Sequence, residues 1–318
     1  MRVKSVSLIA FLLSLSSLTS LVAESTKTGA SLSSLLASYN FRSVHVEKAG
    51  SHLSLRVKIN GKPTSLIIAT AAPMSVLDRN SLRKFGLTER KTTIPLNSTL
   101  GKTSEYVGMS KVKGLEFANI VLADFDAGVI DESVLNRSLP PTAIHLDGVF
   151  GYSQMRKLGA VLDCGQRNLY VNPRGPSREA SAKLEKLLTE RGFTRVPMRF
   201  NAVGHPEVDC RVNGRASIVT VETAAFTTII DKRLASEAGL SQALAPVDAE
   251  AVGRRKAPFS FAVMKDFSVG NFQTQGTKIS VTDVSFNVLG IDYLSSAEAI
   301  IDSGSMNLFL CHRKNPTH

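Results

Sequence analysis

The chain repeats part of its own sequence, and this duplication constrains its fold more than any other feature. At a shift of 153 positions, residues 57–87 align with residues 210–240 with eight identities and no gap. A later block, residues 149–169, aligns with residues 288–308 at a shift of 139 positions. A two-copy repeat with one internal deletion explains both alignments, so the sequence predicts two similar structural units within its 318 residues.

Each copy contains a short apolar run that ends in a turn of small residues. Residues 66–68 (Leu-Ile-Ile) precede residues 69–72 (Ala-Thr-Ala-Ala), and residues 219–221 (Val-Thr-Val) precede residues 222–225 (Glu-Thr-Ala-Ala). Such β-branched runs are typical of buried strands. We therefore expect each strand to present the first residue of its turn, an alanine in one copy and a glutamate in the other, to a cleft.

Other landmarks recur in both copies in the same order. Asn60-Gly61 and Asn213-Gly214 predict tight hairpin turns, because asparagine and glycine tolerate positive φ. Apolar pairs precede Gly151 and Gly290, and an apolar-apolar-Asp strand and a closing apolar strand follow each glycine. Between the copies, residues 172–176 contain the helix breakers Pro and Gly, and a helix is predicted over residues 177–191.

In this order, the landmarks resemble the aspartic proteases of the retropepsin and pepsin type, whose active-site loop is Asp-Thr-Gly-Ala. The resemblance covers residues 50–311 and implies a mainly β fold: two pseudo-symmetric retropepsin-like (acid-protease) β-barrel lobes with a few short helices. It implies that Thr70 and Thr223 hydrogen-bond across the lobe interface, around a cleft for an extended peptide. Residues 98–114 are expected to form a hairpin over this cleft, with Tyr106 as a candidate flap residue.

The sequence departs from the family at the residues that carry the chemistry. Ala69 and Glu222 stand where the family has its two aspartates, and Ala71 and Ala224 replace its glycines. The family mechanism needs two carboxyl groups that share one proton. Because neither aspartate is present, no intact catalytic residue is expected, and the motif is that of a pseudoprotease.

The ends of the chain and its composition suggest where it acts. Residues 1–23 have a basic start and a short apolar core, which predicts a signal peptide and export to the periplasm or outside the cell; the alternative is an N-terminal membrane anchor. The remaining boundaries are a tail (24–49), the first lobe (50–173), a linker with a helix (174–194) and the second lobe (195–318).

Charge and cysteine content exclude several other classes of protein. The net charge of +11 is dispersed and aromatic residues make up 6% of the chain, which favours a solvated surface or an anionic envelope contact over nucleic-acid binding. The three cysteines cannot all pair; a bridge between Cys210 and Cys311 is conceivable, and Cys164 would stay unpaired. The histidines and cysteines have no metal-ligand spacing, so neither a metal nor a cofactor is expected.

Three functions follow from these observations. In the first, the chain is an exported monomer without normal peptidase activity that binds extended peptide or protein segments. In the second, it is an aspartic-type endopeptidase that uses Glu222 together with Asp124 or Asp126. In the third, it is a structural envelope protein with a vestigial cleft. Whether a second carboxyl group lies within hydrogen-bonding reach of Glu222 separates the first two.

Overall fold

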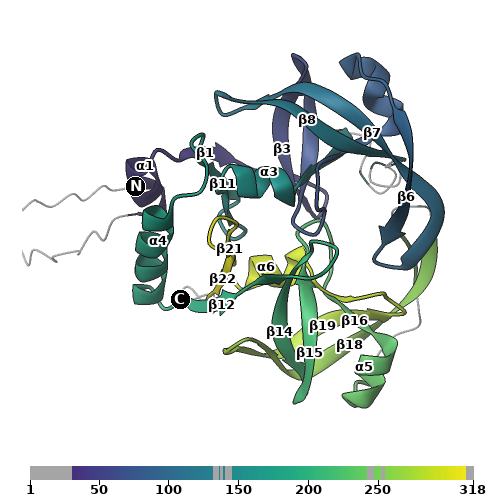
Figure 1. The fold of residues 1–318 in the computed structure, drawn as a ribbon. Helices are drawn as coiled ribbons and strands as arrows, with labels where there is room; N and C mark the ends of the chain where they lie inside the picture. Colours follow the sequence, from purple (N-terminus) through teal and green to yellow (C-terminus); the bar gives the residue numbers. More distant parts are fainter. Residues whose placement is uncertain are drawn as a thin grey trace, which may run out of the picture. The chain divides into compact units, whose positions relative to one another are not determined.

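The structure is a computed structural model, and it describes residues 31–131, 136, 139, 145–241, 247–251 and 255–312. The predicted signal peptide lies outside these residues. Figure 1 shows the arrangement of the strands; those of the described residues, β1 to β22, belong to three sheets. Among the described residues, no helix combines the length and the apolar character that crossing a membrane would require.

The first half of the chain forms an eight-stranded sheet in the order β2-β3-β4-β9-β5-β8-β7-β6, and β3 also pairs with β7. Among the described residues, the short helices η1 and α3 accompany this sheet. The elements are β2 (Glu47–Ala49), β3 (His52–Ile59), β4 (Lys62–Ala69), β5 (Val76–Asp78), the 3-10 helix η1 (Arg79–Phe85), β6 (Arg90–Ser98), β7 (Gly101–Phe117), β8 (Ile120–Ile130), β9 (Leu146–Gly151) and α3 (Tyr152–Lys157).

The second half forms a sheet with the same order of equivalent strands, β13-β14-β15-β20-β16-β19-β18-β17, with an additional β14–β18 pairing. The duplicated sequence therefore folds into two equivalent lobes, as predicted. The elements are β13 (Arg199–Phe200), β14 (Pro206–Val212), β15 (Arg215–Val221), β16 (Ile229–Asp231), α5 (Lys232–Glu237), β17 (Val247–Ala251), β18 (Arg255–Val269), β19 (Phe272–Thr282), β20 (Asn287–Leu289) and α6 (Ile291–Ser296).

A third sheet joins the two lobes. Its six strands follow the order β1-β11-β10-β21-β22-β12, so β10 of the first half pairs with β21 of the second. The helices α1 and α4 cover one side of it with apolar residues such as Leu36 and Leu184 (Figure 1). Its elements are α1 (Leu32–Ser38), β1 (Arg42–His45), β10 (Val161–Asp163), β11 (Asn168–Val171), α4 (Arg178–Glu190), β12 (Thr194–Pro197), β21 (Ile300–Asp302) and β22 (Asn307–Leu310).

The segment assigned to an N-terminal tail differs from that prediction. From residue 32 onward it contains α1, β1 and β2, and β1 pairs with β11 along the edge of the central sheet. The serine and threonine content of this segment suggested a tail. However, Leu36 is fully buried against α4, and this packing outweighs the polar composition.

The asparagine-glycine pairs have the same structural role in both copies of the repeat. Asn60 and Gly61 have φ values of 48° and 77°, as a two-residue hairpin turn of this kind requires. The Asn60 side chain donates to the carbonyl of Phe85 and accepts from the N–H of Gly114. Asn213 makes the equivalent bonds with Ala238 and Asp266. Each asparagine thus ties its hairpin to the end of a short helix and to a neighbouring strand.

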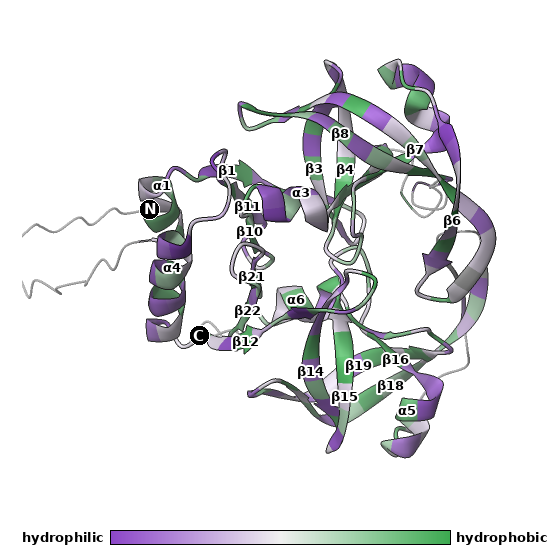
Figure 2. Cartoon of the chain, in the orientation of Figure 1, coloured by the Kyte–Doolittle hydropathy of each residue, from purple (hydrophilic) through white to green (hydrophobic). Residues whose placement is uncertain are grey.

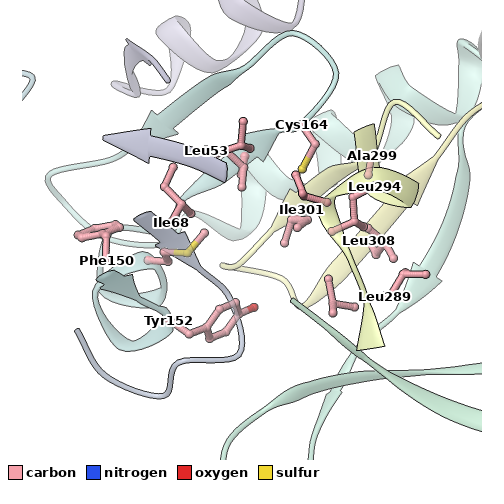
Figure 3. Packing of buried hydrophobic residues seen from close by; sticks show 14 of the residues in the cluster. Leu53, Ile68, Phe150, Tyr152, Cys164, Leu289, Leu294, Ala299, Ile301 and Leu308 are labelled. Carbon is pink, nitrogen blue, oxygen red and sulfur yellow. The ribbon is translucent and has the colours of Figure 1, made fainter. Parts of the chain in front are cut away.

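The hydrophobic core is continuous across the two lobes. Figure 2 shows apolar residues along the inner strands, and Figure 3 shows Ile68 and Phe150 of the first lobe in the same cluster as Leu289 and Leu308 of the second. A shared core of this kind fixes one lobe against the other. The loops that follow β4 and β15 can therefore be held in a defined relative position.

Candidate functional site

Two loops, residues 69–72 and 222–225, are joined by hydrogen bonds of the threonine that each contains at its second position. The Thr70 hydroxyl donates to the Val221 carbonyl at 2.6 Å and accepts from the Thr223 N–H at 3.0 Å. The Thr223 hydroxyl donates to the Ile68 carbonyl at 2.6 Å and accepts from the Thr70 N–H at 3.2 Å. Both threonines are completely buried. The hydrogen bonds that the resemblance implied therefore cross the lobe interface as a symmetric set of four.

The first residue of each loop is chemically different. Ala69 is buried and packs among apolar residues that include Ile67 and Val149. Glu222 is partly buried, and its carboxylate accepts the N–H of Ala224 in its own loop at 2.8 Å. It also accepts the N–H of Ala71 from the opposite loop. One glutamate thus binds the backbone of both loops.

Burial raises the pKa of Glu222 to about 7, although the N–H groups of Ala224 and Ala71 favour its ionised form. Among the described residues, no second carboxyl group hydrogen-bonds to Glu222. Asp124 and Asp126, considered as partners in a rebuilt site, are exposed on β8, where Asp126 pairs with Lys111 of β7. A single carboxyl group can accept or donate one proton, but it cannot form the shared-proton pair.

Alanine is accommodated at both positions where the family has glycine. Neither Ala71 nor Ala224 has a positive φ, and the loop bonds Ala72 N–H to Ala69 carbonyl and Ala225 N–H to Glu222 carbonyl repeat in the two copies. The added Cβ therefore leaves the turn intact.

Gly151 and Gly290 pack against the chain segments that follow the two loops. The Gly151 N–H donates to Ser75 Oγ at 3.0 Å, and the Gly290 N–H donates to Thr228 Oγ1 at 3.1 Å. A Cβ at Gly151 would lie 2.2 Å from the backbone of Met74, and one at Gly290 would lie 2.4 Å from the equivalent backbone. Glycine is therefore needed for close approach of two main chains.

Sequence reasoning missed a pair of histidines beside the loops. His52 hydrogen-bonds to the backbone of Ala224 in the opposite loop, and burial lowers the pKa of its imidazole. His205 packs against the ring of Phe286 at 5.0 Å between ring centroids, and burial lowers its pKa as well. In both, Nδ1 is buried without a hydrogen-bond partner in the described structure. The shift of 153 positions aligns the two histidines, and it was the signal that could have found them.

One prediction about a polar residue needs correction. Asp147 stands beside Gly148, which predicts a turn residue, but it lies within β9 and is buried. Burial alone would raise its pKa, yet hydrogen bonds from Lys84, Ser81 and Thr64 outweigh that effect and lower it. In the part of the chain that the structure describes, no disulfide joins Cys210 to Cys311, and Cys210 is a buried thiol.

The remaining predicted residues have structural positions. Asp163 and Asp302 are buried, and both accept backbone N–H groups in the turns after their strands. Tyr106 lies on β7 opposite Pro95 of β6, with 57% of its surface exposed. The tip of this hairpin is formed instead by residues 98–101.

Two cavities lie away from the loops. One, of about 540 Å³, is bordered by Arg42, the start of β8, Lys157 and residues 173–176. The other, of about 730 Å³, is bordered by β3, β4 and the turn between β7 and β8. Within the described residues, no group of three or more His, Cys, Asp or Glu side chains comes together as a metal site would require.

Comparisons with known proteins point to one family. A family model described as aspartyl protease matches residues 55–153 and 208–293, more than half of the chain. Among solved structures, basic 7S globulin from soybean and conglutin gamma, a basic 7S globulin from lupine seeds, are each 10% identical to this chain. Each alignment covers 86% of this chain and 95% of the globulin, with a TM-score of 0.46. No curated protein matches.

Proposed function

Because the chain belongs to the aspartyl protease family, we propose that it is a member without normal peptidase activity that binds extended peptide or protein segments between its lobes. The proposal rests on one observation. Where the reaction needs two carboxyl groups, the chain has Ala69 and a single Glu222 that hydrogen-bonds to both loops. General acid–base catalysis contributes roughly 10²- to 10⁴-fold in rate, so loss of the pair leaves little turnover.

The binding part of the proposal is supported by what the fold retains. The Thr70–Thr223 bonds and the shared core hold the two loops together without the catalytic pair. Strands and hairpins beside such loops can hydrogen-bond an extended chain as an added strand. One chain supplies both loops, so we propose that it acts as a monomer. We also propose export, supported by the composition of residues 1–23.

Cleavage of a random peptide library, measured from acid to neutral pH, tests the loss of activity. The wild-type chain and Glu222→Gln should both leave the library intact. The double variant Ala69→Asp/Glu222→Asp serves as a comparator, because it restores both carboxyl groups on the same backbone. Cleavage by the wild-type chain that disappears in Glu222→Gln would overturn the proposal and identify a one-carboxyl enzyme.

Retention of the same library on immobilised protein tests the binding. Peptides should be retained at neutral pH and in moderate salt, because the contacts of an added strand are backbone hydrogen bonds and apolar packing. Failure to retain any peptide would contradict a binding role. Retention only at low salt would instead indicate non-specific attraction to the basic surface and favour the structural envelope protein.

A further inference from the structure

The tip of the β6–β7 hairpin belongs to the first lobe but packs against the second. Leu100 is only 7% exposed, and it shares a hydrophobic cluster with Ile229, Phe259 and Val288. The Thr99 carbonyl accepts the N–H of Ser285 at 2.9 Å. Figure 1 shows the end of this hairpin (blue) beside strands of the second lobe (green to yellow). The partly buried residues of the cluster also come from the second half; they are Ala225, Ala257, Val284 and Phe286.

A buried leucine is unusual at this position of a hairpin. Ser98 pairs with Gly101, so Thr99 and Leu100 form a two-residue turn, where exposed polar residues or glycine are preferred. Elsewhere in the same hairpin, Ile94 and Tyr106 are 50% and 57% exposed, whereas Leu96 is 7% exposed. At the tip, the second lobe provides the apolar residues that bury Leu100.

The residues that surround Leu100 belong to elements that adjoin the loop of Glu222. Ala225 belongs to this loop, Ile229 begins β16 further along the same chain segment, and Val288 belongs to β20, which pairs with β15. We call Ile229, Phe259, Val288 and Ala225 the leucine seat. An extended chain that crossed the two loops would meet this seat and the Ser285 N–H beside it.

We propose that the hairpin tip is a latch that occupies the binding site of its own chain. Leu100 fills the leucine seat, and the Thr99 carbonyl takes the hydrogen bond of Ser285. A ligand must displace both before it can lie across the loops. The ligand that fits carries a leucine-like side chain for the seat and a backbone carbonyl for Ser285. This inference rests on the proposed peptide binding, and it adds the regulation of that site.

The latch has a measurable effect on affinity. If only a fraction of the molecules is open, the apparent affinity for any ligand is reduced by that fraction. Removal of the Leu100 side chain takes away the apolar contact that favours the closed state. The open fraction should rise, and ligand binding should strengthen at least about tenfold if that fraction is normally small.

The first experiment measures amide hydrogen exchange of Ser285 in the full chain. In the wild-type protein this amide should be protected, and in Leu100→Ser and Leu100→Ala it should exchange at least about tenfold faster. The amides of Thr70 and Thr223 report whether the lobe interface stays folded. Ile94→Ser is the matched control, because it shortens an exposed side chain of the same hairpin and should leave Ser285 protected. Equal protection in all four proteins would overturn the latch.

The second experiment uses the latch segment itself as a probe. A synthetic peptide of residues 94–105 should bind Leu100→Ser at least about tenfold more tightly than the wild-type chain or Ile94→Ser. The same peptide with serine in place of the leucine that corresponds to Leu100 should not bind. If the peptide binds all proteins equally, the seat is not occupied by Leu100 and the inference fails.

The two proposals can fail separately. If Ser285 becomes exposed in Leu100→Ser and the probe binds, but no member of the random library is retained, the latch is supported and the peptide-binding function is wrong. If the library is retained equally by the wild-type chain and by Leu100→Ser, the binding function is supported and the latch is wrong.

Discussion

The two loops of the site are alike in what holds them and different in what they present. Each loop hydrogen-bonds to the other through a buried threonine. Each is also followed by a hydroxyl group, that of Ser75 or Thr228, which accepts the N–H of a glycine. Yet one loop begins with an alanine and the other with a glutamate. The comparison shows that the architecture of the site does not depend on a pair of acids. It also shows that, within the loops 69–72 and 222–225, Glu222 is the one residue with a carboxyl group.

The close approach of backbones at Gly151 and Gly290 gives the largest expected effect. Gly151→Ala and Gly290→Ala each place a Cβ within about 2.5 Å of main-chain atoms, which cannot move as a side chain can. Each variant should lose more than about 4 kcal/mol of unfolding free energy, measured by urea denaturation.

Gly114→Ala is the matched control for these glycines. Gly114 lies on β7, and a Cβ there would come no closer than 3.9 Å to Val121. Its stability should stay within about 1 kcal/mol of the wild-type value. If only one of Gly151→Ala and Gly290→Ala were destabilised, the two loops would not be supported alike. The similarity between the loops described above would then be wrong.

The crossed threonine bonds give the next effect. Thr70→Val keeps the shape of the side chain but removes the hydroxyl that binds the Thr223 N–H and the Val221 carbonyl. Thr223→Val likewise removes the hydroxyl that binds the Thr70 N–H and the Ile68 carbonyl. Each should cost about 2–3 kcal/mol in the same urea measurement. Because the two hydroxyls belong to one network, the double variant should cost less than the sum of the two.

Thr220→Val provides the control for this pair. Thr220 is 1% exposed, and its hydroxyl has no hydrogen-bond partner in the described structure, so valine should be neutral or stabilising. Unequal costs at Thr70 and Thr223 would show that the interface bonds differ between the lobes although their lengths are similar.

The repeat made most of the fold predictable. Asn-Gly turns, apolar strands and paired glycines recur at fixed shifts, and each corresponds to an element that the structure repeats. The helix α4 was also predictable, because the side chain of Ser177 caps it and Ala180, Leu184 and Leu188 form its buried face. Local chemistry decides these elements, so the sequence alone is sufficient.

Contacts between distant segments were not predictable in the same way. Nothing in residues 98–101 indicates that Leu100 would be buried by the other lobe, because the hairpin turn and its partner strands are about 130 to 190 residues apart. The sequence placed Asp147 in a turn because Gly148 follows it; burial with Lys84 and Ser81 became visible only in the folded chain. The central sheet likewise needs strands from both halves.

The smallest expected effect concerns Glu222 and its dependence on pH. Burial raises its pKa from 4.5 to about 7, so between these values the folded state holds a proton that the unfolded state has released. Wild-type stability should therefore fall as pH rises through this range, and it should level off above it. Glu222→Gln removes this loss. Its stability relative to wild type should increase by about 1–2 kcal/mol from pH 4.5 to pH 7, less than the full shift implies because the side chain is only partly buried.

Urea denaturation at a series of pH values measures this difference, with Glu190→Gln, an exposed carboxylate at the end of α4, as the control. The control should follow the wild-type curve throughout. If Glu222→Gln also followed it, the N–H groups of Ala224 and Ala71 would hold Glu222 ionised at little cost. The two loops would then differ in charge at neutral pH as well as in shape, and a ligand that crosses both loops would meet a fixed negative charge on the second lobe only.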